Sequence, residues 1–65
     1  MSMNATAIWK SFKQLFPDNA KDVTSFKEYD KDSIVLYFKN HKKALLFTID
    51  VSNKTWRLEP YYKKS

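Results

Sequence analysis

The chain has 65 residues, a net charge of +5 at pH 7, and neither glycine nor cysteine. These absences exclude a disulfide framework, a thiolate metal site and a glycine-rich phosphate-binding loop. The unbroken apolar runs are a few residues long, far short of the ~20 that a membrane-spanning helix needs. The start of the chain lacks a basic region followed by an apolar stretch, so we expect no secretion signal and a cytoplasmic location.

A chain of this length is expected to form one domain, residues 1–65, with a small hydrophobic core. A core of this size supplies only about 3–5 kcal/mol of stability. The 5 phenylalanines, 4 tyrosines and 2 tryptophans must provide most of the buried area, because no disulfide adds stability. Association with a partner, or with a second copy of the chain, would bury more surface.

Residues 5–16 show the periodicity of an amphipathic helix. Apolar side chains recur at spacings of three and four along this segment: Ala5, Ile8, Trp9, Phe12, Leu15 and Phe16. Asn4 is suited to cap the helix, and Pro17 ends it because proline disfavours helical geometry at the preceding residue. The pattern predicts that this apolar stripe packs on a sheet, with Trp9 in the core rather than stacked on a ligand.

A weaker strand is predicted at residues 23–29, after a connector at 17–22. Five of the seven carboxylates lie between residues 18 and 32, and we interpret them as solvated because calcium-loop spacing and glycine are missing. The facing of this strand is open. One register puts Tyr29 inside and Phe26 outside, the other puts Phe26 inside, and a bulge would allow both to point inward.

A β-hairpin made of strands 34–39 and 44–51 is predicted at the centre of the sheet, because both segments are rich in aliphatic, aromatic and β-branched residues. Strand side chains alternate between faces, and the pairing of Lys39 with Ala44 gathers the large apolar side chains on one inner face. The inner face then holds Ile34, Leu36, Phe38, Leu45, Phe47 and Ile49. A slip of one residue would split this set.

A fourth strand is predicted at residues 55–61, after a two-residue turn. Its register pairs Ile49 with Leu58 on the inner face and Asp50 with Arg57 on the outer face. Pro60 has no N–H group, so this should be an edge strand. The predicted fold is α+β: an N-terminal amphipathic helix packed on one face of a three- or four-stranded antiparallel meander sheet.

The sequence argues against catalysis. The sole histidine, His41, falls in a predicted turn beside two lysines, with no cysteine or carboxylate next to it. A catalytic triad or a zinc site needs more members than this. We therefore predict a protein that is not an enzyme and that takes no cofactor, metal or small-molecule substrate.

The feature that points to function is an apolar row on the outer face. The predicted registers place Tyr37, Leu46 and Tyr61 side by side, where an uncovered face should be polar. The predicted binding surface combines this row with neighbouring basic and aromatic residues: Tyr37, Leu46, Tyr61, Phe26, Lys39, Arg57 and Lys63. The alternative interpretation is a modest exposed patch, or one that the N-terminus or the basic C-terminal tail caps.

Two classes of partner suit such a surface. One is a protein, including a second copy of the chain; the other is nucleic acid, with bases stacked on the tyrosines and lysines on the phosphates. Only one of the 12 basic residues is arginine, the residue that nucleic-acid recognition favours. Asp50 and Glu59 on the same face also oppose phosphate. The sequence therefore favours protein binding, with nucleic acid as the alternative and no membrane partner.

Overall fold

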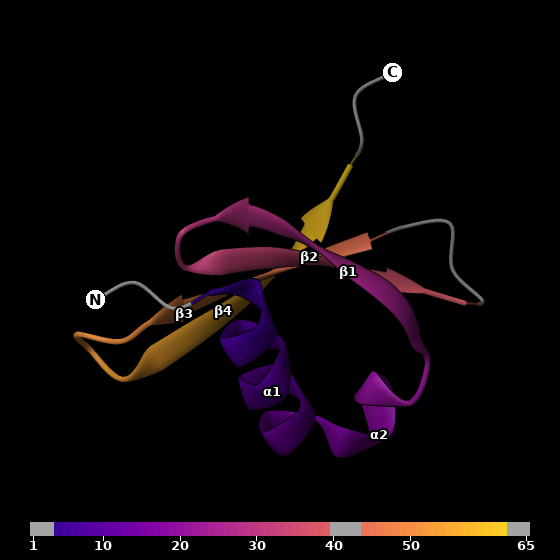
Figure 1. Ribbon diagram of the computed structural model, residues 1–65, viewed down its shortest axis with the longest axis horizontal. Helices are drawn as coiled ribbons and strands as arrows, with labels where there is room; N and C mark the ends of the chain where they lie inside the picture. Colours follow the sequence, from indigo (N-terminus) through magenta and orange to yellow (C-terminus); the bar gives the residue numbers. More distant parts are fainter. Residues whose placement is uncertain (1–3, 40–43, 63–65) are drawn as a thin grey trace.

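The computed structural model describes residues 4–39 and 44–62. Within them the chain forms two helices and four strands, in the order α1 (Ala5–Leu15), α2 (Pro17–Ala20), β1 (Val23–Asp30), β2 (Ser33–Phe38), β3 (Ala44–Asp50) and β4 (Thr55–Tyr61). The strands form one antiparallel sheet in the order β1-β2-β3-β4, with α1 against one of its faces (Figure 1). The predicted α+β fold is confirmed, and the sheet has four strands.

Helix α1 begins and ends as the sequence indicates. The side-chain oxygen of Asn4 accepts a hydrogen bond from the backbone N–H of Ala7 at 2.8 Å, so Asn4 is the N-cap. The helix stops at Leu15, before Pro17. The connector predicted after it contains the short helix α2, which proline opens favourably because its ring presets φ for a first helical position.

The core lies between α1 and the inner face of the sheet. Its fully buried side chains come from both layers: Ile8, Phe12, Ile34, Leu36 and Phe47. The rings of Phe12 and Phe47 meet edge to face, with centroids 5.2 Å apart, and so join the helix directly to the central strands. Leu15 was expected in this core, but it sits at the border of the helix's apolar stripe and remains 47% exposed.

Both hairpin registers differ from the predicted ones by two residues. Tyr37, rather than Lys39, faces Ala44, and Trp56, rather than Leu58, faces Ile49. Side chains alternate with a period of two, so a shift of two residues leaves every side chain on its predicted face. The predicted faces are therefore confirmed, while the predicted cross-strand neighbours are wrong.

The turn between β3 and β4 accounts for the second shift. It has four residues, Val51 to Lys54, instead of two. The Asp50 carboxylate accepts hydrogen bonds from the backbone N–H of Asn53 at 3.2 Å and from its side-chain amide at 2.7 Å. Asp50 thus stabilises the turn and faces Thr55, so the predicted pairing of Asp50 with Arg57 is wrong.

Strand β1 has two irregularities in its pairing with β2, between Val23 and Ser25 and between Glu28 and Asp30. Phe26, between them, faces Leu36 and stacks on Trp9 with ring centroids 5.3 Å apart. The open question about this strand is thereby answered: Phe26 lies on the inner face. Tyr29, in the second irregularity, reaches the opposite face.

Replacement of Phe47 by alanine is expected to lower the free energy of unfolding by about 3–5 kcal/mol, because it removes a buried ring and leaves a cavity beside Phe12. Urea denaturation of the variant measures this loss. Leu15→Ala is the control, since it removes a large apolar side chain that is about half exposed. Equal stability losses in the two variants would contradict the placement of the core.

Lys54→Gly is expected to raise the free energy of unfolding by roughly 0.5–1 kcal/mol. Lys54 has a positive φ, a backbone conformation that is sterically unfavourable for any residue with a Cβ atom but not for glycine. That φ is 56°. Thermal melts compare it with Ser52→Gly, in the same turn but without positive φ, which should destabilise the protein. A loss of stability from Lys54→Gly would contradict the described turn.

Candidate functional site

The predicted outer row is present with altered neighbours. Ala44 pairs with Tyr37 on one side and with Tyr61 on the other, so the two tyrosines flank an alanine rather than Leu46. Leu46 lies in the next row, between Val35 and Glu59. Tyr37, Leu46 and Tyr61 share the face opposite α1, and each is partly buried.

The middle of this outer face is buried. Val35 is 3% exposed and Ala44 is 6% exposed, although the described helix α1 lies against the opposite face of the sheet. Tyr29 on β1 and Tyr61 on β4 come from opposite edges of the sheet, yet their ring centroids are 5.7 Å apart. Such a contact requires a strongly coiled sheet, and Figure 1 shows β1 crossing the C-terminal end of β4. The outer row is thus a second small apolar cluster.

The remaining residues of the predicted surface do not join this cluster as one site. Phe26, expected there in one register, lies on the other face against Trp9. The Lys39 ammonium lies 3.7 Å from the Asp22 carboxylate, and Arg57 Nε lies 2.6 Å from Glu59 Oε1. Lys63 and His41 lie outside the described residues.

A groove between α1 and β4 was missed from the sequence. Trp56, 46% exposed, and Leu15 stand beside Ile49 along this groove, which has a volume of about 320 Å³. We call it the α1–β4 groove, lined by Ser11, Gln14, Leu15, Ile49, Lys54, Thr55 and Trp56. Its apolar residues sit at the margins of their elements, Leu15 at the end of α1 and Trp56 on an edge strand. Their positions, at the end of a helix and on an edge strand, are the feature of the sequence that could have indicated partial exposure.

Trp56 is held in place from its buried side. Its ring meets Phe16 edge to face, with centroids 4.9 Å apart and planes at 88°. It also lies 6.3 Å from the ring of Phe47. The other side of the indole is open, so Trp56 offers a contact surface whose orientation is already fixed.

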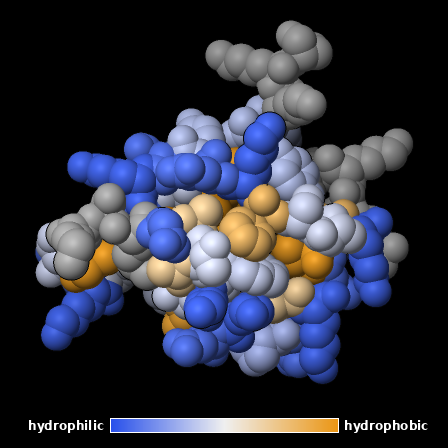
Figure 2. All heavy atoms as spheres, in the orientation of Figure 1, coloured by the Kyte–Doolittle hydropathy of each residue, from blue (hydrophilic) through white to orange (hydrophobic). Residues whose placement is uncertain are grey.

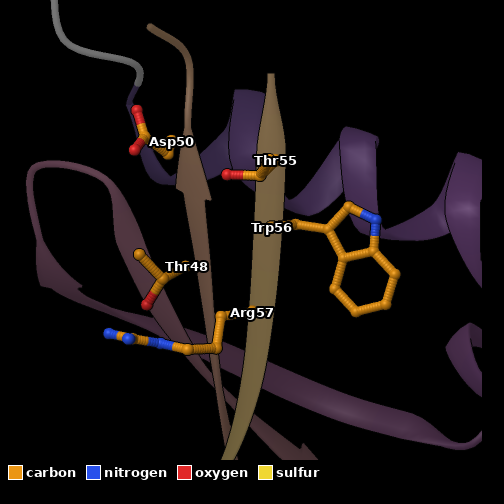
Figure 3. Close-up of a pocket in the computed structure, with 5 residues that line it drawn as sticks. All are labelled: Thr48, Asp50, Thr55, Trp56 and Arg57. Atoms are coloured by element: carbon orange, nitrogen blue, oxygen red, sulfur yellow. The ribbon is translucent and has the colours of Figure 1, made fainter. Parts of the chain in front are cut away.

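The outer face of β4 is polar next to Trp56. Thr48, Asp50, Thr55 and Arg57 line a shallow pocket of about 300 Å³ together with Trp56. Figure 3 shows these four polar residues on one side of β3 and β4, while Trp56 projects from the other side toward α1. Strand β4 therefore presents an apolar face and a polar face along one edge.

A second apolar area lies between α1 and β1, where Figure 2 shows apolar atoms framed by hydrophilic ones. The stacked rings of Trp9 and Phe26 contribute to a pocket of about 340 Å³ there. The Lys13 ammonium lies 5.6 Å from the centre of the Trp9 ring, a cation–π arrangement. Unlike Trp56, both rings are packed within the core layer.

The two edges of the sheet differ in regularity. Strand β1 carries two irregularities, which blunt an edge by bending it away from an approaching strand. Strand β4 pairs with β3 without interruption from Thr55 to Tyr61. Only Pro60 lacks an N–H group along it, so β4 is the more open edge for pairing.

The described surface is nearly neutral in net charge. All seven carboxylates and eight of the twelve basic residues belong to residues 4–39 and 44–62, and the other four are Lys42, Lys43, Lys63 and Lys64. In that same part of the chain, no group of three or more histidine, aspartate or glutamate side chains is placed to hold a metal ion. Neither described helix has the length and hydropathy to cross a membrane.

Comparisons with protein-family models, with curated proteins and with solved structures found no match to this chain.

Tyr61→Ala is expected to lower the free energy of unfolding by about 1–3 kcal/mol, because it removes a ring that contacts Tyr29 and lies beside the buried Ala44. Tyr61→Phe is the matched control, since it keeps the ring, and urea denaturation measures both. Wild-type stability in Tyr61→Ala would show that the outer face needs no cover.

Proposed function

We propose that this chain is a non-enzymatic protein-interaction module that binds its partner along β4 and the α1–β4 groove. The observation that supports this most directly is Trp56, half exposed yet fixed by Phe16 and Phe47. Binding energy at protein interfaces concentrates in such aromatic residues, which lose little conformational entropy when they are already ordered. Leu15 adds an aliphatic surface next to it.

The form of the site suits an extended segment of the partner. A regular, open edge strand offers backbone N–H and C=O groups to an added strand, and a neighbouring groove accepts one of that strand's side chains. Strand β4 has this edge and the α1–β4 groove runs along its inner side. Lys54 at one end of the groove favours a partner segment with an acidic residue nearby.

Nucleic acid has less support as the partner. Arg57 and Lys39 each lie beside a carboxylate, Glu59 and Asp22 respectively, which opposes phosphate. Tyr37 and Tyr61, the expected base-stacking residues, are partly buried in the coiled outer face.

As part of the proposal, the lack of cysteine supports a cytoplasmic setting.

Trp56→Ser and Leu15→Ser are each expected to reduce recovery of partner proteins from a cell extract by roughly tenfold or more, as loss of an interface anchor does. The measurement is capture on the immobilised chain, followed by quantitative mass spectrometry. Val51→Ser is the matched control, because Val51 is 54% exposed and lines neither pocket of β4. Circular dichroism of each variant confirms that it is folded.

Equal recovery by all three variants would contradict the proposal. A titration with a random oligonucleotide at two salt concentrations tests the alternative class. Binding that falls steeply with salt and is unchanged in Trp56→Ser would favour nucleic acid instead.

A further inference from the structure

We propose that β4 pairs with β4 of a second copy of this chain, antiparallel, about a two-fold axis through Leu58. This names the partner for the site under "Proposed function" and rests on that function. The reason lies in the order of residues along the open edge: Trp56, Arg57, Leu58, Glu59 and Pro60. Read against itself in the antiparallel direction, this segment is complementary in charge, in shape and in backbone hydrogen bonding.

The backbone hydrogen bonds show which residues face the open edge. Ile49 donates its N–H to the carbonyl of Asp32, at 2.9 Å, on the β2 side of β3. Its neighbour on the other side, Trp56, therefore receives no ladder hydrogen bond from it. By alternation, Trp56, Leu58 and Pro60 direct their backbone groups away from β3. This placement suits Pro60, whose missing N–H is then not needed in the sheet.

An axis through Leu58 uses these free groups. The two copies of Leu58 face each other and exchange two N–H···O=C bonds, as a hydrogen-bonded antiparallel pair does. The N–H of each Trp56 meets the carbonyl of Pro60 from the second copy. Pro60, which has no donor, is required only as an acceptor.

Charge complementarity favours this register over the registers in which the axis passes through Arg57 or Glu59. With the axis at Leu58, Arg57 of each copy lies opposite Glu59 of the other on the polar face. Moving the axis by one residue would oppose two Arg57 side chains or two Glu59 side chains, which is unfavourable. Arg57 contacts Glu59 of its own chain through Nε, at 2.6 Å, and its remaining N–H groups are donors suited to the second carboxylate.

The apolar face is complementary as well. The same register puts Trp56 opposite Pro60 of the second copy, on the side of the sheet that carries α1. The open side of the indole then packs on a proline ring, and the two α1–β4 grooves lie on either side of the axis. Strand β1 offers no equivalent, because its two irregularities interrupt a regular ladder.

Sedimentation equilibrium of the full chain at concentrations up to about 1 mM tests this pairing, because so small an interface should be weak. We expect a monomer–dimer equilibrium for the wild type. Arg57→Glu and Glu59→Arg should each weaken dimerisation by roughly tenfold or more, since both cross-copy pairs become like-charged. The double variant Arg57→Glu/Glu59→Arg restores opposite charges and should restore the dimer.

A second variant tests the backbone without touching charge. In a synthetic chain with an N-methyl group on the Leu58 nitrogen, both central cross-copy hydrogen bonds lose their donor while the side chains are kept, and the chain should be monomeric but folded. A wild type that stays monomeric throughout, or a dimer unaffected by the single charge reversals, would overturn the pairing. If the wild type is monomeric while Trp56→Ser still abolishes capture of another protein, only the second-copy inference fails. If Trp56→Ser changes neither, the proposed function fails too.

Discussion

The sheet carries apolar side chains on both faces, but helix α1 can bury only one of them. The rest of the structure depends on this constraint. On the inner side α1 meets the need, with Phe12 and Phe47 fully buried against each other. Among the residues that the structure describes, no second layer covers the outer side, and the sheet coils so that the rings of Tyr29 and Tyr61 contact each other across it. The two irregularities in β1 favour this shape, because such features increase the twist of a strand.

The coiling of the sheet also determines which parts of its surface remain exposed for binding. It buries the middle of the outer face, where Val35 lies, and brings β1 toward the C-terminal end of β4. The first half of β4 extends beyond both coverings, with Trp56 supported from behind by Phe16. The half-exposed Trp56 thus lies at the part of the sheet that neither the helix nor the coil covers, at the start of an open strand edge whose charge pattern is self-complementary.

The periodicity of the sequence predicts the elements and their faces, but the sequence does not show the lengths of the turns or the contacts between distant residues. The amphipathic stripe, the Asn4 cap and the alternation of Leu36 with Tyr37 predict the helix and the two faces correctly. The registers could not be predicted, because turn length depends on side-chain contacts such as that between Asp50 and Asn53. The outer row was predicted as an open surface, since its cover is a contact between residues 32 positions apart in the chain. The alternation of side chains places Trp56 on the inner face, but it does not show how far a residue on an edge strand is covered.

The coiling of the sheet is the central claim, and two-dimensional NMR tests it most directly. With ring centroids 5.7 Å apart, Tyr29 and Tyr61 should give strong nuclear Overhauser effects between their ring protons. The Val35 methyl groups should be shielded from a dissolved paramagnetic agent in the same sample, because Val35 is almost fully buried. Absence of the Tyr29–Tyr61 effects, together with Val35 methyl groups that the agent broadens, would contradict the account.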